Sequence, residues 1–153
     1  MFLPLPERPV KPARRIHHSL GIDQSSIEIR STQSGITEFH SFMDKLQHEW
    51  SIPDPLFARL LIAVSEAVLN AVYHGNKLSA DKYVTVTFER TEELFSATVE
   101  DEGDGFAHRR YGTPLEDFEL LKPSGRGIFI MRHQSDFVYY SNRGSKVKLL
   151  FYK

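Results

Sequence analysis

The sequence contains no cysteine, and no apolar run approaches the roughly 18 residues needed to span a bilayer. The absence of cysteine excludes disulfides, thiolate metal sites and cysteine nucleophiles. The sequence also has no large excess of positive or negative residues, since the formal net charge at pH 7 is -1. This balance gives no general electrostatic reason to bind nucleic acid or an anionic membrane. Residues 1–6 lack the apolar segment of a signal peptide, and we expect a cytoplasmic protein.

The length of 153 residues and the hydrophobic content of 41% are typical of one compact domain with a core. Residues 1–22 hold four of the eight prolines and a basic cluster, Arg14-Arg15 among it. We expect this segment to be a flexible arm, with a partner-binding segment as the alternative. Residues 23–153 are expected to form the folded domain.

Hydrophobic periodicity predicts alternating helices and strands after the arm. Asp54 is expected to cap a long buried helix that runs to about His74 and ends at Gly75. The other expected elements are a strand at 26–30, a helix at 37–50, a hairpin over 83–101, a mobile loop at 102–124, a helix at 128–134 and a second hairpin over 137–151.

The stretch Asp101-Glu102-Gly103-Asp104-Gly105 is the most informative in the chain. It follows an alternating strand in which Phe95, Ala97 and Val99 share one face, and the period of two carries Asp101 onto that apolar face. A carboxylate that points inward needs a hydrogen-bond donor or a shifted pKa, because buried charge is expensive. Two glycines beside it allow a flat ligand to approach the backbone.

Two further polar features accompany this motif. Glu66 and Asn70 lie four residues apart on the long apolar helix, so their side chains share one face. The alternative is a satisfied hydrogen-bond pair in the core or an exposed edge of the helix. Gly125-Arg126-Gly127 precedes an apolar helix and offers backbone N–H groups at a helix N-terminus, where phosphates bind. Ser145 shares the strand parity of Val147, and we expect its hydroxyl to face inward as Asp101 does.

Taken in order, the runs Glu66–Gly75, Asp101–Gly105 and Gly125–Met131 resemble the GHKL (Bergerat-fold) ATP-binding superfamily. Within it, the sequence is most similar to the anti-sigma-factor serine/threonine kinases. The resemblance covers roughly residues 24–153. It implies an α/β sandwich in which helices cover one face of a mixed β-sheet and ATP lies between the helices and a lid.

The resemblance also implies roles for single residues. Asp101 would accept a hydrogen bond from the adenine amino group, directly and through a water that Ser145 also holds. Gly103 and Gly105 would let the base and sugar lie close. Asn70 would coordinate Mg²⁺ through its amide oxygen. The remaining roles are phosphate binding by Gly125 and Gly127 with Arg126 as an extra charge, and orientation or deprotonation of the attacking hydroxyl by Glu66.

Other polar residues give weaker signals. His74 is read as a hydrogen-bonding residue at a helix end, and Lys77 as either a phosphate contact or a solvated side chain. Arg109 and Arg110 suit either an acidic partner or a solvated lid. A metal site on His40, Asp44 and His48 is discounted because no further ligand is visible. A phosphoacceptor role for His48 is discounted because only 22 residues separate it from Asn70.

Two functions follow from the sequence. In the first, the protein is an ATP-dependent and Mg²⁺-dependent serine/threonine kinase that phosphorylates a small antagonist protein and so controls a sigma factor. In the second, it holds nucleotide without using it and sequesters a partner as a binding module. The relatives commonly form homodimers, and no direct contact with nucleic acid or membrane is expected. The identity of the substrate protein is not encoded in any motif.

Overall fold

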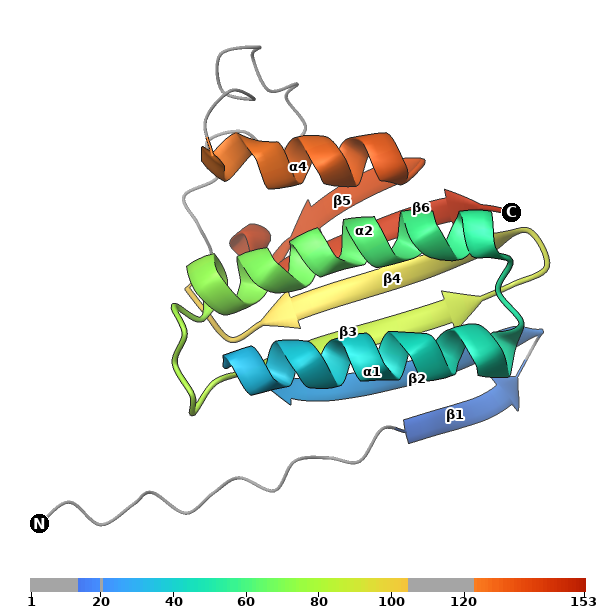
Figure 1. The fold of residues 1–153 in the computed structure, drawn as a ribbon, viewed down its shortest axis with the longest axis horizontal. Coiled ribbons are helices and arrows are strands. Elements are labelled where there is room, and N and C mark those ends of the chain that lie inside the picture. Colours follow the sequence, from blue (N-terminus) through green and yellow to red (C-terminus); the bar gives the residue numbers. More distant parts are fainter. Residues whose placement is uncertain (1–13, 20, 105–122) are drawn as a thin grey trace, which may run out of the picture.

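The computed structural model describes residues 14–19, 21–104 and 123–153. Among these residues, pairs of strands are separated by two helices, α1 and α2, and by one helix, α4 (Figure 1). The elements are β1 (Arg14–Ser19), β2 (Ile22–Arg30), α1 (Gln33–Trp50), α2 (Asp54–Asn70), the π-helical turn η1 (Ala71–Gly75), β3 (Tyr83–Arg90), β4 (Leu94–Asp101), α4 (Pro123–Gln134), β5 (Phe137–Ser141), the 3-10 turn η2 (Asn142–Gly144) and β6 (Lys146–Tyr152).

The strands form one six-stranded sheet in the order β1-β2-β3-β4-β6-β5. Helices α1, α2 and α4 lie on one face of it (Figure 1), which confirms the predicted α/β sandwich. The predicted mixed sheet is wrong in one respect, because every strand pair in the described residues is antiparallel. The reason is that β6 lies between β4 and β5, which run in the same direction, so these two strands are not neighbours.

The core lies between the sheet and the helices. Alternate residues of β3, Val84, Val86 and Phe88, are buried on the face that the helices cover. Helix α2 buries residues at helical spacing, Leu60 and Val64 among them, against this face. Each fully buried side chain of this size contributes about 1.5–3 kcal/mol through removal of apolar surface from water. The predicted hairpins β3–β4 and β5–β6 are both confirmed.

Three helix boundaries differ from the prediction. Helix α1 begins at Gln33, because the Thr32 hydroxyl accepts a hydrogen bond from the N–H of Gly35 at 3.1 Å and caps the helix. Asp54 is the first residue of α2 and not its cap, which is Pro53. Helix α4 begins at Pro123, since proline suits the first helical turn, where its missing N–H has no partner to lose.

The helix expected to run to His74 changes from α-helical to π-helical geometry before its end. The α-helix ends at Asn70, and the chain continues as η1 to Gly75. A π-helical turn inserts extra backbone into a helix and turns the side chains that follow, and such turns are frequent at functional sites. The two candidate residues on α2, Glu66 and Asn70, therefore lie just before a change in helical geometry.

The arm expected at residues 1–22 is partly a strand. Arg14–Ser19 forms β1, which pairs antiparallel with β2 at one edge of the sheet. Residues 1–13 lie outside the described residues. So do Gly105, Arg109, Arg110 and the rest of 105–122, which include most of the expected loop.

The segment Asp54–Gly75 is long and apolar enough to meet the criteria for a membrane span, which the sequence reading did not expect. It has 22 residues, and an 18-residue window within it has a mean hydropathy of 1.6. Its buried positions, Leu60, Ala63 and Val64 among them, belong to the core between α2 and the sheet. The apolar composition is thus explained by packing inside the domain.

Candidate functional site

Glu66 and Asn70 of α2 face the first turns of α4. A methyl group at Gly127 would lie 2.9 Å from Oε2 of Glu66 and 3.4 Å from Nδ2 of Asn70. Gly127 is buried at this contact. The lack of a side chain at position 127 therefore lets α4 approach both polar groups, which the sequence indicated only as a shared helix face.

Gly125-Arg126-Gly127 lies inside α4 and does not precede it, which corrects the predicted order. The first backbone N–H groups of an α-helix have no acceptor within the helix, and the helix dipole is positive at this end. Because α4 begins at Pro123, Gly125 and Arg126 belong to this first turn. The arrangement brings an end of positive potential beside Glu66 and Asn70. The side chain of Arg126 is exposed.

Asp101 ends β4 on the face that the helices cover. Its Oδ1 accepts a hydrogen bond from the N–H of Gly103 at 2.8 Å, and its own N–H donates to the carbonyl of Ser145 at 2.8 Å. Burial raises the pKa of the Asp101 carboxyl above its ordinary value, and the neighbouring Glu100 adds to the increase. The hydrogen bond from Gly103 and the charge of Lys82 oppose the increase in pKa only in part.

The Asp101 carboxylate is enclosed by two glycines from different elements. A methyl group at Gly75 would lie 2.3 Å from Oδ2 of Asp101, and one at Gly103 would lie 2.1 Å from the carbonyl oxygen of Gly75. No side chain fits at either position without movement of backbone or carboxylate. Gly75 therefore belongs to the site, whereas the sequence indicated it only as the end of a helix.

A small cavity connects these residues. It measures about 20 Å³ and is bordered by polar groups of Asn70, Asp101 and Ser145. The remaining walls come from α2, η1, α4, β4, β5, η2 and β6, with the residues Ala67, Ala71, Val99, Met131, Tyr140, Gly144 and Val147. A volume of this size holds about one water molecule.

Ser145 lies directly before β6 and borders the cavity. Its hydroxyl donates to the carbonyl of Asn142 at 2.9 Å, and this bond leaves the lone pairs of the oxygen available as acceptors. The η2 turn before it uses left-handed backbone at Asn142, Arg143 and Gly144. The hairpin turn thereby brings Ser145 beside Asp101, to whose N–H its carbonyl is bonded.

Some candidate residues are not part of this cluster. His74 and Lys77 are both exposed, and neither borders the small cavity. His40 contacts the hydroxyl of Ser65 at 3.3 Å. In the part of the chain that the structure describes, no group of three His, Cys, Asp or Glu side chains is arranged to hold a metal ion.

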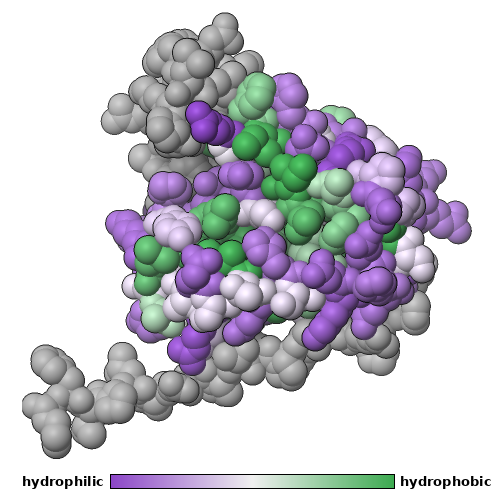
Figure 2. Space-filling model, viewed as in Figure 1, coloured by the Kyte–Doolittle hydropathy of each residue, from purple (hydrophilic) through white to green (hydrophobic). Residues whose placement is uncertain are grey.

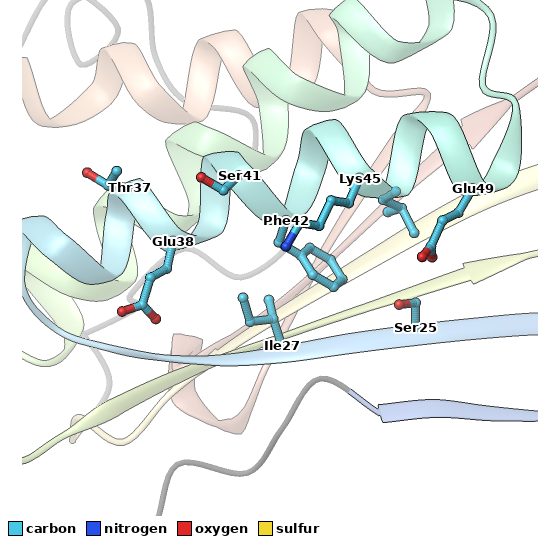
Figure 3. Close-up of a pocket in the computed structure, with 9 residues that line it drawn as sticks. Ser25, Ile27, Thr37, Glu38, Ser41, Phe42, Lys45 and Glu49 are labelled. Carbon is cyan, nitrogen blue, oxygen red and sulfur yellow. The ribbon is translucent and has the colours of Figure 1, made fainter.

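A larger groove of about 450 Å³ lies elsewhere, between α1 and β2 (Figure 3). Its apolar floor includes Ile27 and Phe42, while Glu38 and Glu49 lie toward its two ends (Figure 3). None of the candidate site residues borders this groove. Volume alone therefore does not identify the functional site in this fold.

Asn76 is the residue that the sequence reading missed most clearly. It follows η1, its side chain is buried, and it bonds to groups on three other segments. A polar residue after a helix end is an ordinary sequence feature, so no local signal distinguishes it.

Comparison with known proteins gives a consistent result. Residues 29–151 match the model of the histidine kinase-like ATPase domain. A protein named serine-protein kinase RsbW from Bacillus subtilis (strain 168) is 35% identical over 89 residues, which are 54% of this chain and 56% of that protein. Proteins of the same name from Staphylococcus epidermidis and Staphylococcus aureus (strain JH9) are 28% and 29% identical over 99 residues, 60% of this chain. The matched region spans 62% of each staphylococcal protein.

Proposed function

The chain belongs to the histidine kinase-like ATPase domain family, and from this premise we propose that it is an ATP-dependent serine/threonine protein kinase. Its substrate is a small antagonist protein, and its biological role is that of an anti-sigma regulatory factor. The observation that carries the proposal is the convergence of Asn70, Asp101 and Ser145 on one cavity beside the first turns of α4. The printed name of the relatives, serine-protein kinase, supports the same reaction.

The base of ATP binds at the Asp101 end of the site. The ionised carboxylate accepts a hydrogen bond from the adenine amino group. The small cavity holds one water between Asp101, Ser145 and the base, since its volume of about 20 Å³ suits one water. Because a guanine base presents a carbonyl oxygen at the same place, Asp101 also excludes GTP.

The phosphates bind at the Asn70 end. The backbone N–H of Gly125, in the first turn of α4, holds the phosphate oxygens, Gly127 lets the helix lie close to them, and Arg126 adds a positive charge. The amide oxygen of Asn70 fits Mg²⁺, a hard cation that takes one or two protein ligands and fills its shell with phosphate oxygens and water. The bound ion would neutralise charge on the phosphates, and Asn70 is the residue of this chain that would hold it.

Glu66 acts on the attacking hydroxyl group of the substrate. Its carboxylate lies one helical turn before Asn70 and directly beside Gly127, so it is close to the proposed phosphate position. From there it orients the serine or threonine hydroxyl and accepts its proton as the phosphoryl group is transferred. Phosphoryl transfer depends mainly on positioning and charge stabilisation: the fixed carboxylate supplies the positioning of the hydroxyl, and a bound Mg²⁺ with Arg126 would supply the positive charge.

The partner binds near the nucleotide. Ile62 of α2 and Phe129 of α4 are exposed, and Figure 2 shows hydrophobic surface over this part of the helical face. An apolar surface beside a site is suited to a protein substrate. We place the protein in the cytoplasm as a regulator that contacts the antagonist and a sigma factor, with a homodimer as its assembly and no direct contact with nucleic acid.

Phosphoryl transfer tests this proposal directly. Antagonist captured from the source organism on the immobilised protein is incubated with γ-labelled ATP and Mg²⁺, and labelled serine or threonine is measured. We expect transfer that Glu66→Ala reduces by about 100-fold or more. Glu38→Ala, which removes an exposed carboxylate of α1, is the matched control and should leave transfer unchanged.

Two results separate the alternatives. Undiminished transfer by Glu66→Ala would contradict the role given to this residue. ATP binding with no transfer to any captured protein would instead support the binding module, in which nucleotide switches partner affinity without being consumed.

A further inference from the structure

Asn76 has a buried side chain, 1% exposed, that is bonded to three separate segments. Its Nδ2 donates to the hydroxyl of Ser31 at 2.7 Å and to the carbonyl of Tyr83 at 2.8 Å. Its Oδ1 accepts from the N–H of Glu102 at 2.8 Å. The side-chain amide thus joins the end of β2, the start of β3 and the chain just after β4.

The backbone of Asn76 is fixed as well. Its N–H donates to the carbonyl of Ala71 at 2.8 Å, which is the hydrogen bond that closes η1. The residue is therefore tied through its backbone to the turn that follows Asn70. Through its side chain it is tied to the segment that follows Asp101.

Three consecutive N–H groups around Asp101 are each held by a different partner. The N–H of Asp101 donates to Ser145, that of Glu102 to Asn76, and that of Gly103 to the Asp101 carboxylate. The side chain of Glu102 is anchored too, because its Oε2 accepts from the N–H of Tyr83 at 2.8 Å. Asn76, the residue that directly follows η1, supplies one bond of this set.

We propose that Asn76 is a positioning residue that fixes the Asp101 carboxylate relative to Asn70 and thereby sets the preference for adenine over guanine. The proposal rests on the function given above, because it assigns a specificity role within the same nucleotide site. Asn76 does not border the cavity around Asp101 and acts through the backbone of Glu102. It is not a catalytic residue.

The ratio of ATP to GTP affinity distinguishes this role from a merely structural one. A general loss of stability weakens the binding of both nucleotides in similar proportion. A displaced Asp101 carboxylate instead loses its bond to the adenine amine and also its repulsion of the guanine carbonyl. The ratio of the two affinities then falls, which a structural defect alone would not produce.

The test compares the wild-type protein with Asn76→Ala and Ser31→Ala. Binding of Mg-ATP and Mg-GTP is measured by calorimetry, and exchange of the Glu102 amide hydrogen is followed by NMR without nucleotide. For Asn76→Ala we expect faster exchange at Glu102 and a fall of about tenfold or more in the ATP to GTP ratio. Ser31→Ala removes one partner of Asn76 but leaves its bonds to Tyr83 and Glu102, so the ratio should stay unchanged.

A folded Asn76→Ala protein with the wild-type ratio would overturn the proposal. If Asn76→Ala does not fold, Asn76→Asp decides, because it keeps an acceptor for the N–H of Glu102. If the Glu102 amide of Asn76→Asp is protected from exchange and the ratio of ATP to GTP affinity is that of wild type, the positioning role of Asn76 is supported. If the amide is protected but the ratio has fallen, the role is overturned. Wild-type protein that binds neither nucleotide would contradict the proposed function itself, a result distinct from both outcomes with the variants.

Discussion

Gly75 lies so close to Asp101 that a methyl group at position 75 would sit 2.3 Å from the carboxylate oxygen Oδ2. The end of the π-helical turn and the end of β4 thus meet at one carboxylate. This contact joins the two parts of the proposed nucleotide site, since the turn follows Asn70 directly. The site is therefore defined by the close approach of the backbone at Gly75 to Asp101 and Gly103, and not by a large pocket.

Gly75→Ala should disturb this contact. The added methyl group must displace the carboxylate or the backbone of η1, and overpacking of this kind costs about 1–3 kcal/mol of unfolding free energy. We expect that loss in chemical denaturation together with weaker ATP binding. Gly21→Ala is the control, because Gly21 has a φ of 74° with no atom near the new methyl group and lies in the β1–β2 connection. It should lower stability while ATP affinity is retained; equal ATP affinity in both variants would contradict the assigned role of Gly75.

Gly127→Ala should separate activity from stability. Alanine favours a helix over glycine by about 1 kcal/mol, so the unfolding free energy should stay level or rise. The new methyl group would lie 2.9 Å from Oε2 of Glu66 and force this side chain to move. We expect phosphoryl transfer to fall by about tenfold or more, since a displaced catalytic group loses its geometry. A variant that is both stable and fully active would show that the approach of α4 to Glu66 has no catalytic role.

The raised pKa of Asp101 predicts a specific dependence of stability on pH. Because burial raises this pKa above 3.8, the folded protein binds the proton more tightly than the unfolded chain does. The resulting stabilisation is present below the unfolded pKa and is lost as pH rises through the folded pKa. The wild-type protein therefore loses stability as pH rises, whereas Asp101→Asn has no carboxyl group to ionise at this position. The unfolding free energy of Asp101→Asn minus that of wild type should increase from about pH 4 to pH 7.

Urea denaturation across this pH range measures the effect. Asp81→Asn, which neutralises an exposed carboxylate, controls for the general change in net charge. A difference between Asp101→Asn and wild type that does not vary with pH would show that burial does not raise the pKa of Asp101.

Strand periodicity was sufficient to predict the position of Asp101. The alternation that buries Phe95, Ala97 and Val99 determines which face the next odd residue takes, and the register with β3 and β6 preserves it. The same logic predicted both hairpins. Local pattern works here because each strand is half buried and a shift by one residue would expose its apolar face.

The missed features depend on contacts between distant segments. The π-helical turn after Asn70, the enclosure of Asp101 by Gly75 and the bonds of Asn76 all form only once β2, β3 and β4 surround the end of α2. Similarly, the start of α4 at Pro123 was missed because the expected loop over 102–124 included this residue. Hydrophobic periodicity does not report such contacts, since they involve polar or small residues at the ends of elements.

Calorimetric titration of Mg-ATP and Mg-GTP into the wild-type protein and Asp101→Asn tests the central claim most directly. The account predicts that wild type binds ATP at least about tenfold more tightly than GTP, because Asp101 accepts from the adenine amine and repels the guanine carbonyl. In Asp101→Asn this preference should disappear. Equal affinity of the wild-type protein for the two nucleotides, or an unchanged preference in Asp101→Asn, would contradict the account.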